Sequence, residues 1–341
     1  MQESFVFLSG ENQSLGRNEV EALLEMRGGT PDISWFGRLG IFEGEESQTK
    51  FLRNRAAMIK HNGVVIAKVK EFAEGIEQIP KSVIESVIGA DESFRIRTHS
   101  LDWKSNMKVR KELTTLLGDR IQDVTGANVS LDNPDVEFRL FLVKGMTIVC
   151  KSMKSILRRH LVKKQPQRLV SFHPSVMNAL VARAMCNLAQ LKKNEMMVDP
   201  YCGIGGILFE ASQIGANVVG MDIEWLRLRG AVKNLSSLKN AKFNIIQGDA
   251  QFIPVRGCDK IITDPPYGRA SSTYGAEAEN LVSSLFEQIP KILAEDGKAC
   301  VCSSSEMQLG ELAEKRGLSI ERKVSIRVHR SLTREIVVLK S

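Results

Sequence analysis

VDPYCGIGG, at residues 198–206, decides the fold class, because an apolar strand runs directly into a glycine-rich turn that begins a helix. Glycine is needed where a backbone turns tightly or where a ligand approaches the chain within contact distance. Gly203, Gly205 and Gly206 give G-x-G-G, without the G-x-x-x-x-G-K-S/T pattern of a phosphate-binding loop. Asp199, just before the turn, adds a carboxylate that can reach a cationic amino group. The stretch predicts a ligand site at the end of this strand.

From about residue 170 onward the sequence repeats strand, loop and helix. Strands are predicted at residues 195–199, 217–222, 243–248, 260–264 and 298–303. Helices are predicted between them, at residues 206–214, 225–239 and 279–294. Two final strands are predicted at residues 319–329 and 333–340, joined by a short turn. This order predicts an α/β fold with a doubly wound, mostly parallel sheet and an antiparallel terminal hairpin, the Rossmann-like architecture of class I methyltransferases.

Acidic side chains end the next two predicted strands. Asp222 follows the apolar run 218–221, about 20 residues after the glycine turn, where an acid typically accepts both ribose hydroxyls of an adenosyl group. We prefer Asp222 to Glu224 because it ends the apolar run directly. Asp249 is expected to accept a hydrogen bond from the adenine amino group, and Ala250 to offer its backbone N–H to the ring. Three acids on one sheet edge of this fold indicate S-adenosylmethionine as the cofactor.

TDPPYG, at residues 263–268, indicates the chemistry. An exocyclic amine on a nucleobase is a poor nucleophile, because its lone pair is delocalised into the ring. It needs acceptors that hold the amine and draw its hydrogens as the methyl group arrives. Asp264 and the main-chain carbonyl of Pro265 are the predicted acceptors, and Pro266 helps to fix their geometry. Tyr267 offers a stacking face for an extruded base, so the motif predicts methylation of an exocyclic amino group.

The chain resembles the archaeal tRNA guanine-10 N2-methyltransferases and their eukaryotic relatives. The resemblance is carried by DPYCGIGG at residues 199–206, DPPYGR at 264–269, FHPS at 172–175 and HRSLTR at 329–334. NPDVEFR, at residues 133–139, looks like the last strand of a THUMP domain. The match is strong from about residue 165 onward, whereas the first 90 residues agree in length and rhythm only.

The resemblance implies a ferredoxin-like segment, a THUMP domain and a class I methyltransferase domain, with tRNA as substrate and partner. It implies methylation of the guanine N2 amine at position 10, giving N2-methyl- or N2,N2-dimethylguanosine. Members often have Phe and Thr where this chain has Tyr201 and Ile204, which changes the packing of the glycine loop. The residues expected to contact the cofactor are His173, Asp199, Cys202, Gly203, Gly205, Asp222, Ile223, Asp249 and Ala250. For His173, a structural role is the alternative.

The composition changes near residue 165. Upstream of it, short apolar alternations predict strands at residues 5–8, 64–67, 94–97 and 136–143, and helical patterns lie at 17–26 and 107–117. This is an α+β pattern. Pro166 marks a hinge, because proline disfavours helix in the residue before it. We expect two parts: 1–165, a ferredoxin-like and THUMP RNA-binding region whose basic linker lies at about 151–168, and 169–341, the methyltransferase domain.

Positive charge is concentrated in two stretches. The chain has a net charge of +7, and residues 151–168 contain seven lysines and arginines without an acidic residue. The second basic stretch spans residues 95–111. Such clusters suit a polyanionic partner, although solvated faces are the alternative. The predicted RNA contacts are Arg95, Arg97, Arg158, Arg159, Lys163 and Lys164. Arg330 and Arg334, at the terminal hairpin, are expected either to touch phosphate or to be exposed.

The six cysteines form no C-x-x-C pair, which favours reduced intracellular thiols and predicts no metal site. No apolar run reaches the length of a membrane helix, and the first residues lack the positive flank of a signal peptide. We therefore expect a cytoplasmic protein, a monomer, with no membrane partner.

Three other functions fit parts of the sequence. A DNA adenine-N6 methyltransferase shares D-P-P-Y, but the chain lacks a target-recognition insertion and has a long upstream region. The same architecture also suits guanine methylation at another tRNA position or in ribosomal RNA. A non-catalytic RNA-binding protein would have lost Asp264 or the glycine loop, and both are intact.

Overall fold

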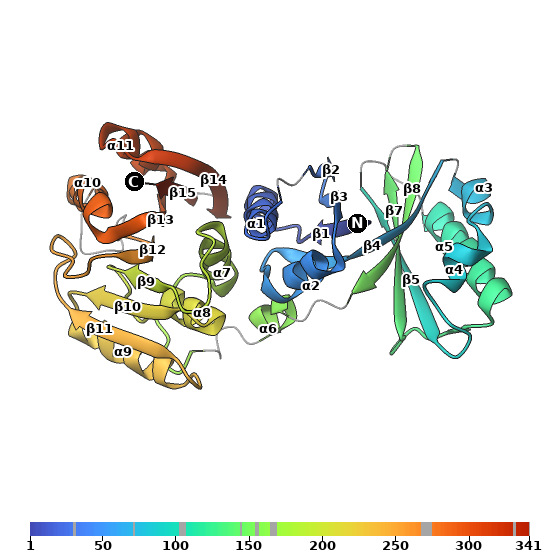
Figure 1. Ribbon diagram of the computed structural model, residues 1–341, viewed down its shortest axis with the longest axis horizontal. Helices are drawn as coiled ribbons and strands as arrows, with labels where there is room; N and C mark the ends of the chain where they lie inside the picture. Colours follow the sequence, from blue (N-terminus) through green and yellow to red (C-terminus); the bar gives the residue numbers. More distant parts are fainter. Residues whose placement is uncertain are drawn as a thin grey trace. The chain divides into compact units, whose positions relative to one another are not determined.

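The structure divides the chain into two compact units, drawn in Figure 1. It is a computed structural model that describes residues 1–29, 32–70, 72–101, 107–143, 145–153, 157–163, 169–266, 275–329 and 332–340. The first unit comprises Met1–Gly10, Gly29–Asn54 and Ile59–Ile156. The second unit comprises Glu11–Gly28, Arg55–Met58 and Leu157–Ser341. Two short segments from the amino-terminal part of the sequence therefore pack within the second unit.

The first unit is built on an eight-stranded sheet with the order β2-β3-β1-β4-β8-β7-β5-β6. Its strands are β1 (Gln2–Leu8), β2 (Ser34–Phe36), β3 (Leu39–Gly44), β4 (Ile59–Lys70), β5 (Ser93–Ser100), β6 (Asn128–Val129), β7 (Val136–Val143) and β8 (Met146–Met153). β5 pairs in parallel with β6 and β7, and the other neighbours are antiparallel. Its helices are α2 (Glu46–Arg55), α3 (Phe72–Glu77), α4 (Lys81–Glu85) and α5 (Met107–Thr125). Figure 1 shows α3, α4 and α5 on one face of this sheet, where Phe94, Phe138 and Leu117 pack together.

The second unit is built on a seven-stranded sheet with the order β11-β10-β9-β12-β13-β15-β14. Its strands are β9 (Met196–Asp199), β10 (Asn217–Asp222), β11 (Lys242–Gln247), β12 (Cys258–Thr263), β13 (Leu293–Ser304), β14 (Ser319–His329) and β15 (Leu332–Lys340). β9 to β13 run parallel, and β15 is antiparallel to β13 and to β14. Its helices are α1 (Gln13–Glu25), α6 (Leu157–Lys163), α7 (Ala179–Leu188), α8 (Gly206–Ile214), α9 (Trp225–Ser236), α10 (Gly275–Ile292) and α11 (Leu309–Lys315).

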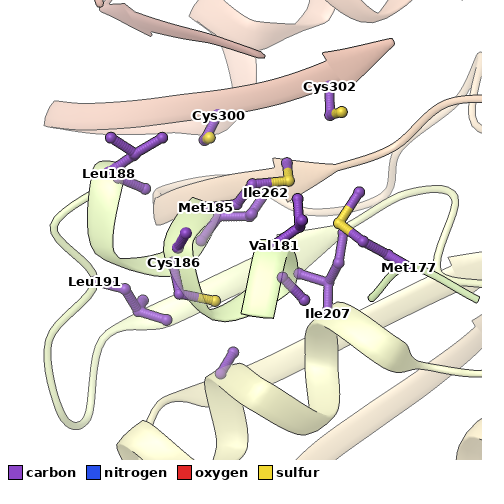
Figure 2. Close-up of a cluster of buried hydrophobic side chains, with 14 of the residues drawn as sticks. Met177, Val181, Met185, Cys186, Leu188, Leu191, Ile207, Ile262, Cys300 and Cys302 are labelled. Atoms are coloured by element: carbon purple, nitrogen blue, oxygen red, sulfur yellow. The ribbon is translucent and has the colours of Figure 1, made fainter. Parts of the chain in front are cut away.

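Apolar side chains fill both faces of this second sheet. On one face, α7, α8 and α9 pack against the strands together with Leu15 and Ala22 of α1. Figure 2 shows Val181 and Met185 of α7 facing Ile262 of β12, beside cysteines of β13. The other face is covered by α10 and α11. The inner strands β9, β10, β12 and β13 are largely buried, which explains their apolar runs.

Helix α1 is held in the second unit by a buried carboxylate. Glu19 is fully buried and accepts hydrogen bonds from the backbone nitrogens of Ala57 and Met58, both at 2.8 Å. It also accepts a hydrogen bond of 2.7 Å from the Asn187 amide of α7. Burial raises the pKa of Glu19 despite these donors. A buried carboxylate is tolerated only where such donors replace water.

The Rossmann-like α/β fold predicted from the sequence is confirmed. The structure has a strand at each site predicted from residue 195 onward, although β13 begins earlier, at Leu293. The sequence analysis missed α7, nearly all of whose residues are buried. It also missed the short α2 and strand β8. The domain boundary near residue 165 stays a prediction, because residues 164–168 lie outside the described residues.

Replacing Glu19 with alanine is expected to lower the free energy of unfolding by roughly 2–4 kcal/mol, because two buried backbone N–H groups and an amide lose their acceptor. Urea denaturation, followed by tryptophan fluorescence, measures this loss. The matched control is Glu21→Ala on the same helix, whose carboxylate lies 3.4 Å from Arg322 and is 34% exposed. It should cost less than about 1 kcal/mol. Equal losses in the two variants would contradict the role given to Glu19.

Candidate functional site

The candidate site lies where the strand order of the second sheet reverses. The chain passes from β9 through α8 to β10 on one side, and from β12 through α10 to β13 on the other. In open α/β sheets, ligands bind outside the carboxyl ends of the strands at such a switch point. Asp199 ends β9, and Thr263 ends β12. The Thr263 hydroxyl donates a hydrogen bond of 2.6 Å to Asp199 Oδ1 and joins the two strand ends.

Asp199 is enclosed almost completely, with 1% of its surface exposed. Besides Thr263, it accepts a hydrogen bond of 3.2 Å from the backbone nitrogen of Tyr201. Burial, helped by the nearby Asp264 and Asp222, raises the pKa of Asp199 to about 7, although the two hydrogen bonds oppose the rise. A cationic group placed beside Asp199 would stabilise its ionised form.

The glycine loop takes its shape from positive φ angles. Gly203 has φ 53° and Gly205 has φ 80°, in the left-handed region that side chains rarely adopt. A Cβ built at Gly205 would lie 3.2 Å from the Cβ of Ala231, so α9 approaches the loop closely there. A Cβ at Gly203 would meet no heavy atom within 4 Å, so this side of the loop is open to a ligand. The Cys202 nitrogen donates to the carbonyl of Met221 at 2.9 Å.

Asp222 links the glycine loop to the end of β10. Its Oδ2 accepts a hydrogen bond of 2.9 Å from the Gly203 nitrogen, and its Oδ1 accepts one of 2.9 Å from the Glu224 nitrogen. Asp222 is 9% exposed. Each carboxylate oxygen has a second lone pair. Asp222 can therefore accept two further hydrogen bonds from a pair of neighbouring hydroxyls.

The end of β11 contributes a turn and an apolar rim. Asp249 is exposed and accepts a hydrogen bond of 2.9 Å from the Gln251 nitrogen. Ala250 is buried, and its carbonyl accepts a hydrogen bond of 2.9 Å from Gln288 of α10. Three large apolar side chains near these turns are exposed: Ile223, Trp225 and Phe252. Apolar groups around a few polar ones are typical of small-molecule sites.

Asn234 is a site residue that the sequence analysis missed. It is fully buried on α9, accepts a hydrogen bond of 2.7 Å from the Ser171 nitrogen and donates one of 3.0 Å to the Ser171 carbonyl. Its amide also donates to the carbonyl of Ile204 at 2.8 Å. The Asn234 side chain thus connects the segment around Ser171, which precedes α7, to the glycine loop. Only the placement of this asparagine in three dimensions shows its role.

His173 lies on this tied segment and is exposed. Its Nδ1 is 2.7 Å from the Ser175 hydroxyl and accepts a hydrogen bond of 3.2 Å from the Ser175 nitrogen. The ring therefore stabilises its own turn, which agrees with the structural alternative. Its contact with a cofactor stays a prediction.

The D-P-P segment follows β12 directly. Asp264 is partly buried, Pro265 is buried and Pro266 is partly buried. The carboxylate of Asp264 lies 3.6 Å from the guanidinium of Arg334 on β15, measured from Oδ2 to Nη1. Arg334 is only 18% exposed, so the expectation of an exposed arginine is wrong. Tyr267 and Arg330 lie outside the described residues, and the stacking role of Tyr267 stays a prediction.

Of the predicted RNA contacts, Arg95 and Arg97 lie on β5 of the first unit. Arg97 is exposed. Arg95 is partly buried and donates a hydrogen bond of 2.6 Å to Glu137 and one of 3.1 Å to the carbonyl of Leu131. Arg97 therefore has the freer side chain for contact with a phosphate.

The other predicted RNA contacts lie on or after α6. Arg158 is 13% exposed, lies 3.5 Å from the carboxylate of Glu11 and donates a hydrogen bond of 2.9 Å to the Ala57 carbonyl. These contacts give Arg158 a structural task within the second unit. The side chains of Arg159 and Lys163, and all of Lys164, lie outside the described residues. The RNA-binding roles of this group stay predictions.

Comparisons with known proteins identify the family. Residues 166–336 match the RMKL-like methyltransferase domain, and residues 67–150 match the THUMP domain. The chain belongs to the RMKL-like methyltransferase family. The donors and acceptors at the strand ends fit the family's cofactor, S-adenosylmethionine: Asp222 offers acceptors for two hydroxyls, and Asp199 offers an acid for an amino group. The chain is therefore an S-adenosylmethionine-dependent methyltransferase with a THUMP domain.

The family's relatives align with almost the whole chain. A tRNA (guanine(10)-N2)-dimethyltransferase of Methanothermobacter thermautotrophicus is 31% identical, with 99% of both chains covered. The protein of the same name in Methanocaldococcus jannaschii is 25% identical, with 98% of both chains covered. The crystal structure of TrmN from Thermus thermophilus has a TM-score of 0.61 and 15% identity, with 100% of both chains covered. This last similarity supports the fold.

Neither a metal cluster nor a membrane-spanning helix is found in the described residues. In that part of the chain, no three His, Cys, Asp or Glu side chains are grouped so that they can hold a metal ion. None of its helices is long and apolar enough to cross a membrane.

Replacing Asp222 with alanine is expected to weaken S-adenosylmethionine binding about tenfold or more, on the order of 1.5–3 kcal/mol, because charge-assisted hydrogen bonds are lost. Isothermal titration calorimetry measures the affinity. The control is Glu224→Ala, whose carboxylate accepts a hydrogen bond of 2.9 Å from Arg227 at the surface. It should change the affinity less than about twofold. A larger effect at Glu224 would show that we chose the wrong acid.

Cofactor affinity is expected to depend on the ionisation of Asp199, whose pKa burial raises to about 7. Below that pH the carboxyl of the free protein is protonated, and an approaching ammonium group must displace the proton. Affinity should therefore fall as the pH drops below 7, by at most about tenfold per pH unit, and level off above it. Calorimetry across this range tests the expectation, with Asp199→Asn as the control that removes the titration. An affinity that rises as the pH falls would contradict it.

Proposed function

We propose that the chain transfers the methyl group of S-adenosylmethionine to the N2 amine of a guanine in tRNA, with guanine 10 as the target. One observation carries the proposal. Asp264 directly follows Thr263, whose hydroxyl donates a hydrogen bond of 2.6 Å to Asp199 at the glycine loop. The Asp264 carboxylate, the proposed acceptor for the amine, is thereby held next to the glycine loop. The names of the two relatives that align with nearly the whole chain support the choice of tRNA and of position 10.

In this proposal the D-P-P segment prepares the amine. Asp264 and the carbonyl of Pro265 accept hydrogen bonds from its two N–H groups and bring the nitrogen lone pair out of conjugation. Bound S-adenosylmethionine supplies a methyl group on a positively charged sulfur. Methyl transfer would form the N–C bond, break the C–S bond and release S-adenosylhomocysteine. The amine would give up one proton, and Asp264 is the group placed to draw it. Pro266 stiffens the turn, and Tyr267 stacks on the extruded guanine.

The strand ends divide the work of holding the cofactor. Asp222 accepts the two ribose hydroxyls, and Asp199 takes the amino group of the methionine part. Asp249 and the backbone nitrogen of Ala250 bind the adenine, with Ile223 against the ring. The remaining contacts come from Cys202, Gly203 and Gly205 of the glycine loop and from His173, which precedes α7.

We further propose a division of labour along the chain. Residues 1–165 grip the tRNA and set the distance to the target guanine, and residues 169–341 perform the chemistry. The match of residues 67–150 to the THUMP domain supports this division. Arg97 is the predicted contact whose exposure on β5 suits a phosphate best. The protein acts as a monomer in the cytoplasm, where tRNA is available.

Replacing Asp264 with alanine is expected to abolish methyl transfer while leaving cofactor affinity within about threefold, because an acceptor for the amine acts mainly in the transition state. The assay combines radiolabelled S-adenosylmethionine, unmodified tRNA, nucleoside analysis and mapping of the modified position. Calorimetry on the same variant shows whether the cofactor site is intact. Turnover above about a tenth of the wild-type value would exclude the role of Asp264. Label at a base other than guanine would exclude the proposed substrate.

A further inference from the structure

Asp264 and Arg334 continue an apolar stripe of the second sheet at its carboxyl edge. Ile262 on β12, Cys300 and Cys302 on β13, and Ile336 on β15 all contribute to the core beneath α7 and α8. Side chains on one face of a strand recur every second residue. Asp264 therefore follows Ile262, and Arg334 precedes Ile336, on the same face. The stripe ends in a carboxylate and a guanidinium.

The register of the strands brings the two charges together. Thr263 of β12 pairs with Val301 of β13, and Ser304 of β13 pairs with Arg334. Arg334 reaches past β13, and its Nη1 lies 3.6 Å from Asp264 Oδ2. Both charges also act on the thiol of Cys302 on the strand between them: Asp264 raises the pKa of that thiol and Arg334 lowers it. The pair is 16% exposed at Asp264 and 18% exposed at Arg334, so solvent screens it only in part.

We propose that Arg334 is a positioning residue for methyl transfer, which holds the Asp264 carboxylate ionised and in one orientation before the guanine arrives. This inference rests on the proposed function, since it gives Arg334 its effect through Asp264. Neither the glycine loop nor the D-P-P-Y motif includes this arginine, and it comes from the terminal hairpin.

The distance between the Arg334 guanidinium and the Asp264 carboxylate suits a residue that positions the carboxylate. Charge-assisted hydrogen bonds between nitrogen and oxygen are about 2.7–2.9 Å long, so a separation of 3.6 Å is an ion pair without a tight shared proton. The cation favours the charged form of the carboxylate without removing its capacity to accept hydrogen bonds. It also restricts rotation of the carboxylate about its last bond. An amine then meets an acceptor that is already aligned.

A test of Asp264 ionisation must separate the effect of Arg334 from the effects of other titratable groups near Asp264. Three titratable groups whose charge couples to Asp264 are Asp199 of β9, Cys302 of β13 and Arg334 of β15. Burial holds the pKa of Cys302 well above its usual range, so this thiol does not titrate near neutral pH. Saturating cofactor removes the contribution of Asp199 to binding. The difference in the acid limb between the wild type and a neutral variant then reports the effect of Arg334.

The test measures single-turnover methylation of unmodified tRNA against pH, at saturating cofactor and saturating tRNA, for the wild type, Arg334→Gln and Arg334→Lys. Loss of the cation raises the pKa of Asp264, so the acid limb in Arg334→Gln should move up by about 1 pH unit. Loss of the fixed carboxylate orientation should also lower the plateau rate at neutral pH by about tenfold. Arg334→Lys keeps the charge and should stay within about threefold of the wild type. Arg334→Met, whose apolar stem extends the row of Ile336, is the second neutral variant if the glutamine variant does not fold.

The results for these variants decide whether Arg334 positions Asp264. Cofactor affinity within about threefold of the wild type, measured by calorimetry, shows that a variant is folded. An unchanged rate and acid limb in the neutral variants would overturn the inference, as would a loss in Arg334→Lys as large as in Arg334→Gln. A higher KM for tRNA with unchanged single-turnover rate would instead make Arg334 a phosphate contact. Failure of the wild type to form N2-methylated guanosine would refute the proposed function and leave Arg334 without this role.

Discussion

The hydrogen bond from Thr263 to Asp199 connects the two halves of the second unit's sheet at the point where the strand order reverses. Thr263 is fully buried and Asp199 nearly so, and a hydrogen bond in such a low-dielectric interior is stronger than one in water. It sets the distance between the glycine loop, which follows β9, and the D-P-P segment, which follows β12. A contact between a hydroxyl and a carboxylate therefore joins the ligand-holding turn to the amine-accepting turn, in addition to the backbone pairing of β9 with β12.

Buried polar side chains perform similar tasks elsewhere in the second unit. Asn234 joins the segment around Ser171 to the glycine loop, and Glu19 joins α1 to the backbone at residues 57–58. The Arg183 guanidinium pairs with Glu210 at 2.9 Å and links α7 to α8, with both side chains almost fully buried. Apolar packing supplies most of the stability of such a unit, but it does not fix orientation sharply. These directional contacts fix where each loop begins.

The sequence was sufficient to predict the residues that end each strand of the site. Asp199, Asp222 and Asp264 each follow an apolar run, and their position on one sheet edge follows from parallel strands alone. The contacts of Arg334 and Asn234 could not be assigned in this way, because their partners lie far along the chain. The HRSLTR stretch marks Arg334 but does not show that it pairs with Asp264. Helix α1 looked like part of the amino-terminal region for the same reason. Its core contacts, such as Leu15 and Ala22, are made with segments that come much later.

The placement of α1 has a consequence for biosynthesis. Its Glu21 pairs with Arg322 of β14, 301 residues further along the chain. At about 5–20 residues per second, a ribosome takes roughly 15–60 s to cover that distance. During this interval Leu15 and Ala22 lack the part of their core that comes from the terminal hairpin, such as Val324 and Ile336. The first unit has its last strand by Met153, whereas the second unit cannot close until the terminal hairpin leaves the ribosome. The earliest helix to be synthesised is thus among the last to dock, and until then its apolar side is open to chaperones or to a neighbouring nascent chain.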